Sequence, residues 1–76
     1  MSWQERITSD PEVMGGKPTI KHTRVPVQII VGSLAGGMTA EDICHEYRVA
    51  PEDVRAALAY AAESLAEERL YALPPR

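Results

Sequence analysis

Residues 38–58 read MTAEDICHEYRVAPEDVRAAL, and this stretch has the layout of a helix-turn-helix unit. Thr39 is a favourable N-cap residue, because its hydroxyl accepts a hydrogen bond from a free N–H group of the first helical turn. Asp42 lies three positions further on, as in a capping box that has Asp in place of the preferred Glu. The stretch therefore predicts a helix over residues 39–47, followed by a short turn.

A second helix is predicted over residues 51–71. Pro51 suits its first position, where a missing N–H costs no hydrogen bond. Glu52 and Asp53 follow in the first turn, where negative charge opposes the helix dipole favourably. Val49 supplies an apolar side chain to the turn before this helix. Aliphatic residues recur at helical spacing and form its predicted inward face: Val54, Ala57, Leu58, Ala61 and Leu65.

One more helix is predicted before this unit, over residues 27–35. It follows Pro26 and ends at Gly36-Gly37, which is a usual C-terminal stop. Its apolar residues lie at positions i, i+3, i+4 and i+7: Val27, Ile30, Val31 and Leu34. The helix at 39–47 carries an inward-facing stripe of the same spacing: Ala40, Ile43, Cys44 and Tyr47. Cys44 is therefore expected to be a small buried apolar residue.

Residues 7–26 are predicted to be extended chain. Two β-prone runs, at 18–21 and 23–25, flank His22, and this pattern favours a hairpin that turns at His22. The predicted fold class is therefore mainly α. A single domain over residues 1–76 would combine an N-terminal β-hairpin with a three-helix bundle that contains the helix-turn-helix.

The size of the chain predicts a thin core. A chain of 76 residues buries only about 60% of its unfolded surface. Small domains usually gain stability from disulfides, metals or oligomerisation, and a single cysteine excludes an internal disulfide. A homodimer is therefore expected.

The sequence contains neither an apolar run long enough to cross a bilayer nor an apolar signal-peptide core near its start. With one cysteine, this favours a cytoplasmic protein with no membrane partner. We also expect no enzyme activity, since no phosphate-binding glycine loop or nucleophile motif is present. Cys44 and His45 point about 100° apart around a helix and cannot easily share a metal, so no metal site is expected. The sequence also carries no motif that would bind a cofactor or a small-molecule substrate, and neither is expected.

The candidate nucleic-acid contacts are basic residues, three of them in a segment without acids between Met14 and Pro26: Lys17, Lys21, Arg24 and, on the last helix, Arg55. In a helix-turn-helix the start of the second helix enters the major groove. Here that start carries Glu52 and Asp53, which oppose attraction to phosphates. If DNA is bound, the basic hairpin is the better contact surface.

A second stripe on the last helix is a candidate dimer or partner interface. It consists of small and apolar residues beside the inward face: Ala59, Tyr60, Ala62, Ala66, Leu70 and Leu73. Small residues allow close approach of another helix, although high helix propensity also explains the alanines.

The run GGKPTIKHTRVPV at residues 15–27 resembles the GGKPxIxGTRIxV segment of the family called domain of unknown function 433. GMTAEDI at 37–43 and PEDVRAALAY at 51–60 resemble its second half. The resemblance implies a winged-helix or homeodomain-like unit of a mostly bacterial family, many of whose members look like antitoxins encoded beside nuclease-like toxins. His22 stands where the family usually has Gly, so this position is expected to need a positive φ.

Two functions remain open from the sequence. The first is a non-enzymatic binding module, similar to an antitoxin that sequesters a nuclease-like toxin. The alternative is a DNA-binding transcriptional regulator that uses the helix-turn-helix and the basic hairpin. Lys17 and Arg24 also have a structural alternative, in which Arg24 binds a carboxylate or backbone carbonyls and pins the hairpin to the helices.

Overall fold

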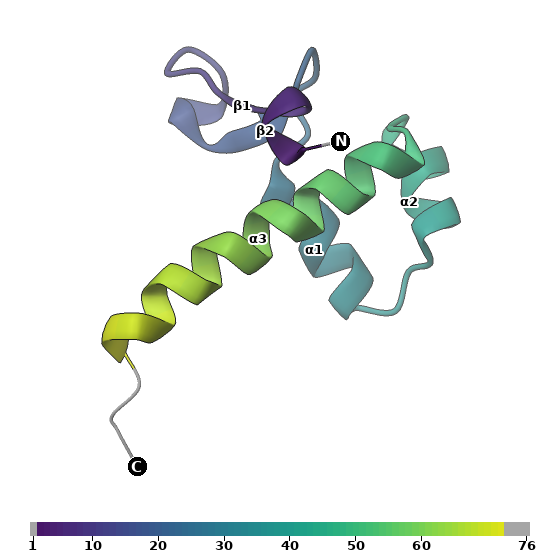
Figure 1. Ribbon diagram of the computed structural model, residues 1–76. Coiled ribbons are helices and arrows are strands. Elements are labelled where there is room, and N and C mark those ends of the chain that lie inside the picture. The colour runs from purple at the N-terminus through teal and green to yellow at the C-terminus, as the bar shows by residue number, and fades with distance from the viewer. Residues whose placement is uncertain (1, 73–76) are drawn as a thin grey trace.

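The computed structural model describes the backbone of residues 2–72 and the side chains of residues 2–67. Two short strands precede three helices: β1 (Ile7–Ser9), β2 (Pro18–Ile20), α1 (Val27–Ala35), α2 (Ala40–Tyr47) and α3 (Pro51–Ala72). Short 3-10 turns lie at Trp3–Glu5 and Met14–Gly16. The hairpin lies across one end of the helices, and α3 extends well past α1 (Figure 1). The expected fold class, mainly α with a hairpin and three helices, is confirmed.

The hairpin differs from the predicted one in its pairing. β2 pairs antiparallel with β1, with Ile7 opposite Ile20, so the connection runs through residues 10–17. The predicted second strand at 23–25 is wrong, because these residues belong to a tight turn that the hydrogen bond from the Ile20 N–H to the Val25 carbonyl closes. Next to this turn, an isolated antiparallel bridge joins Thr19 of β2 to Pro26.

The helix-turn-helix unit has the expected local chemistry. The Asp42 N–H donates to Thr39 Oγ1 at 3.0 Å, so Thr39 caps α2. Arg48 ends α2 in the left-handed conformation, with φ 58°. Val49 is buried in the turn, and Pro51 is the first residue of α3.

The core joins the hairpin to all three helices. Its buried apolar residues come from both strands, from each helix and from the turn: Ile7, Ile20, Val27, Ile30, Ile43, Val49, Val54, Ala56 and Ala57. Ile30 and Ile43 are each 0% exposed and are the largest apolar side chains at its centre. Cys44, expected to be buried, is only half-buried, and Ala40, expected to face inward, is exposed.

The predicted inward face of α3 is partly wrong. Leu58 is 44% exposed and Leu65 is 58% exposed, whereas Ala56, absent from the predicted face, is 4% exposed. The reason is that α3 contacts α1 and α2 as well as β1 and the Trp3–Glu5 turn. Packing from the hairpin side moves the buried arc of α3 toward Ala56, and periodicity within one helix does not reveal that second layer.

Substitutions at Ile43 and Leu58 distinguish the observed core from the predicted one. Ile43→Ala should lower the free energy of unfolding by about 2–5 kcal/mol, because it leaves a cavity at a fully buried position. Leu58→Ala should cost about 1 kcal/mol or less, because the side chain already contacts solvent. Urea denaturation followed by circular dichroism measures both. Equal losses of unfolding free energy in the two variants would contradict this arrangement of α3.

Candidate functional site

A tight turn at residues 20–25 presents the most basic part of the sequence. The Ile20 N–H donates to the Val25 carbonyl at 2.9 Å, and the Thr23 N–H donates to the Ile20 carbonyl at 3.1 Å. The Thr23 hydroxyl donates to the Ile20 carbonyl at 2.7 Å and accepts from the Val25 N–H at 3.0 Å. These four hydrogen bonds fix the backbone of the turn.

His22 occupies the left-handed position within this turn. Its φ is 66°, so the expectation that this position needs a positive φ is confirmed. The conformation is uncommon for a residue with a Cβ, and the surrounding hydrogen bonds hold it there. The His22 side chain is exposed at the tip.

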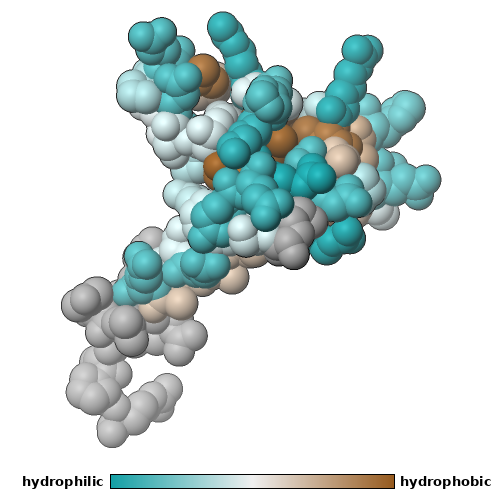
Figure 2. Space-filling view, turned by 45° about the horizontal axis from the view of Figure 1, so that its top comes forward, coloured by the Kyte–Doolittle hydropathy of each residue, from teal (hydrophilic) through white to brown (hydrophobic). Residues whose placement is uncertain are grey.

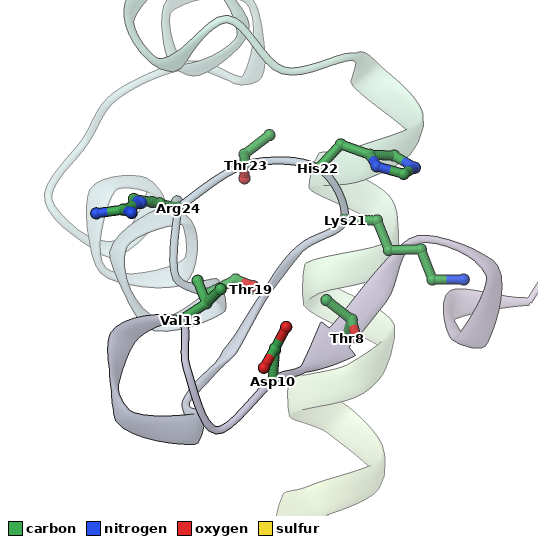
Figure 3. A pocket seen from close by; sticks show the side chains of 8 residues that line it. All are labelled: Thr8, Asp10, Val13, Thr19, Lys21, His22, Thr23 and Arg24. Carbon is green, nitrogen blue, oxygen red and sulfur yellow. The ribbon is translucent and has the colours of Figure 1, made fainter.

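The turn borders an open pocket of about 620 Å³ (Figure 3). Eight residues line it: Thr8, Asp10, Val13, Thr19, Lys21, His22, Thr23 and Arg24. Lys21 and His22 point to one side of the turn, and Arg24 points to the opposite side (Figure 3). The carboxylate of Asp10, whose Oδ1 accepts from the Glu12 N–H at 2.9 Å, lies below them. The site thus combines two separated cations with one carboxylate.

The other two basic candidates lie elsewhere. Lys17 lines a different groove, described below. Arg55 is exposed on α3 beside Ser2 and Trp3. The structure therefore brings Lys21 and Arg24 together at one turn and does not group Lys17 or Arg55 with them.

The hairpin is pinned to the helices by Arg6, which the sequence analysis did not select. Arg6 Nη1 lies 2.8 Å from Asp53 Oδ1, and Asp53 Oδ2 accepts from the Ala50 N–H at 2.9 Å. The hydrogen bond to Asp53 raises the pKa of the Arg6 guanidinium. Arg24 is exposed and has no ion-pair partner among residues 2–67, so the pinning role considered for Arg24 is filled by Arg6.

This ion pair also corrects the role given to Asp53. The sequence placed Asp53 at the exposed start of the second helix of the helix-turn-helix, facing a DNA groove. Instead it is 9% exposed and faces Arg6. An acid at the third position of a helix often accepts a hydrogen bond from the backbone N–H of the residue that precedes the helix, and this signal could have predicted the contact with Ala50.

An apolar groove of about 530 Å³ separates α1 from the later turns of α3. Residues of both helices and of the segments flanking β2 line it: Lys17, Pro18, Pro26, Val27, Gln28, Val31, Gly32, Tyr60, Ala61, Ser64 and Leu65. Lys17 is the one charged residue among these. On the face of the molecule that Figure 2 shows, small brown hydrophobic areas lie exposed among teal hydrophilic side chains.

The candidate interface on α3 is exposed in part. Ala59, Ala62 and Ala66 are exposed. Tyr60 is half-buried and packs edge-to-face on Trp3, with ring centroids 4.9 Å apart. Trp3 Nε1 in turn donates to Glu63 Oε2 at 2.7 Å. The side chain of Leu70 and all of Leu73 lie outside the described residues.

The part of the chain that the structure describes contains no group of three or more His, Cys, Asp or Glu side chains that could hold a metal ion. Within the described residues, no helix has both the length and the apolar character needed to cross a membrane.

Thr19 and Thr23 form a matched pair for a stability test. Thr19 is 0% exposed and its hydroxyl has no hydrogen-bond partner among the described residues, whereas the Thr23 hydroxyl has two. Thr19→Val should raise the free energy of unfolding by about 1 kcal/mol, because it removes an unpaired buried polar group. Thr23→Val should lower it by about 1 to 2 kcal/mol. Thermal and urea unfolding measure both; a loss of stability in Thr19→Val would show that its hydroxyl is paired.

Comparison with known proteins places the chain in a family. The family described as "Protein of unknown function (DUF433)" matches residues 7–61. The uncharacterized protein y4eO of Sinorhizobium fredii (strain NBRC 101917 / NGR234) is 36% identical over 59 residues, which cover 76% of this chain and 27% of that protein. The crystal structure of Rv2018 from Mycobacterium tuberculosis is similar with a TM-score of 0.63 and 31% identity, covering 68% of this chain and 24% of that one. The chain thus spans about a quarter of the length of these relatives. It belongs to the DUF433 family of proteins of unknown function.

Proposed function

We propose that this chain is a non-enzymatic binding module of the antitoxin type, which acts in the cytoplasm and holds a nuclease-like toxin. The observation that carries the proposal is the apolar groove between α1 and α3. Its volume of about 530 Å³ lies in the range of pockets that receive ligand or partner side chains.

The shape and chemistry of the groove favour an amphipathic helix of the partner. Val31 on α1 faces the groove opposite Ala61 and Leu65 on α3, so both walls are aliphatic. Such a groove accepts apolar side chains spaced along one face of a helix. Leu65 is 58% exposed, so a partner would gain by covering it.

Charge supports a basic partner. Exposed acids lie on α2 at Glu41, Asp42 and Glu46, and on α3 at Glu67, and the net charge of the chain is −3. A nuclease presents positive charge to its nucleic-acid substrate, so opposite charges would favour association with this module.

Leu65→Arg tests the groove, with Ile29→Arg as its matched control. Both side chains are large, apolar and exposed, but only Leu65 lines the groove. The module should co-purify with the product of the adjacent gene and inhibit its nuclease activity. Leu65→Arg should weaken binding at least tenfold by calorimetry, because a buried unpaired charge costs more than 1.4 kcal/mol.

Ile29→Arg should bind as the wild type does. Equal weakening by both variants would exclude the groove as the contact. A neighbouring product that lacks nuclease activity, or that does not bind the module, would argue against the antitoxin type.

We also propose that the module is a homodimer that pairs through α3. Ala59, Ala62 and Ala66 are exposed at positions three and seven residues apart, which places them along one face of the helix. The small residues on this face would let two α3 helices approach closely.

The Ala62→Arg/Ala66→Arg double variant tests this dimer. Long charged side chains on a close helix contact should convert a dimer to a monomer, as measured by sedimentation velocity. Ala35→Arg, at an exposed alanine of α1, should leave the sedimentation coefficient unchanged. A double variant that sediments as the wild type does would remove α3 from the interface.

A further inference from the structure

We propose that the turn at residues 21–24 binds the backbone phosphates of duplex DNA, by a surface separate from the groove between α1 and α3. The turn carries Lys21, His22 and Arg24 on exposed positions. No acidic residue occurs in the sequence between Met14 and Pro26.

The directions of the side chains favour a polyanion over a single phosphate. Lys21 and Arg24 point to opposite sides of the turn (Figure 3). One phosphate would meet only one of them, whereas the two strands of a duplex, or successive phosphates of one strand, present charge on both sides. The arrangement is that of a wing tip, which lies along the DNA and contacts backbone on either side.

The backbone of the turn is organised before binding. Thr23 holds it through its N–H and its hydroxyl, and the Ile20–Val25 hydrogen bond closes it. The Thr23 hydroxyl donates one hydrogen bond and accepts another within the turn. Binding therefore orders only the ends of two side chains, which lowers its entropic cost.

The start of α3 is the less favourable DNA surface. The charge of Asp53 is neutralised there by Arg6, but the negative charge of Glu52 is not. On the preceding helix, α2, Glu41 and Glu46 are exposed and add further negative charge. Arg55 is the exposed cation in the first turns of α3. Negative charge on this side would repel phosphates, so the contact is assigned to the turn.

One group within the site opposes phosphate binding. The Asp10 carboxylate lies between the two cations and is held by the Glu12 N–H. Asn keeps the same acceptor oxygen and removes the charge. Asp10→Asn should therefore tighten DNA binding without disturbing the turn.

Fluorescence anisotropy with a labelled duplex of about two helical turns and arbitrary sequence tests the proposal. The full chain should bind it, and the affinity should fall steeply between roughly 50 and 200 mM salt. The Lys21→Gln/Arg24→Gln variant should lose binding at least tenfold. It should also reduce the slope of log K against log salt by about 2, since each lost phosphate contact removes about 0.9.

Three further measurements make the test specific. Arg55→Gln and the groove variant Leu65→Arg should bind DNA as the wild type does. Asp10→Asn should bind the duplex about two- to threefold more tightly than the wild type, because the charge that it removes is exposed and largely screened by salt. The proposal would be overturned if the Lys21→Gln/Arg24→Gln variant kept the affinity and salt slope of the wild type. It would also be overturned if Arg55→Gln lost as much affinity for the duplex as that double variant does. Saturable binding of inorganic phosphate alone, with no binding of the duplex, would assign the site to a free anion and overturn the DNA proposal.

Unchanged thermal unfolding of each variant shows that the fold is retained. Because Leu65→Arg separates the two surfaces, loss of toxin binding in the groove and loss of DNA binding at the turn can be observed independently.

Discussion

The packing of α3 on two sides is the constraint on which the rest of this structure depends. α1 and α2 cover one side of α3, and β1 with the Trp3–Glu5 turn covers the other. The Arg6–Asp53 ion pair, with the hydrogen bond from Ala50 to Asp53, links the hairpin to the first turn of α3. Without this second layer, the thin core of a 76-residue chain would be formed by the three helices alone.

The hairpin also sets where the two candidate surfaces lie. β2 places Thr19 and Ile20 in the interior, while the residues immediately before it line the groove and those immediately after it form the basic turn. A short strand with a turn at each end thus separates an apolar surface from a cationic one. This separation is why we assign a protein partner and DNA to different parts of the molecule.

Much of the local structure followed from the residues themselves. Thr39, Pro51 and the Gly36-Gly37 pair predicted where helices begin and end, because capping and proline chemistry act over three or four residues. The positive φ at His22 followed from the resemblance to a family with Gly there. The family resemblance itself rested on short motifs and is confirmed over residues 7–61.

Contacts between distant residues were decided only by the tertiary structure. The sequence could not predict that β2 pairs with β1, that Arg6 rather than Arg24 pins the hairpin, or that Leu58 and Leu65 face outward. A helical stripe reports which residues share a side of one helix, but it does not report how many elements pack on that helix or from which direction. The sequence by itself therefore determined the elements and their ends, through interactions within a few residues. The tertiary structure alone determined the buried arc of α3, the Arg6–Asp53 ion pair and the groove, because each depends on the packing of segments far apart in the chain.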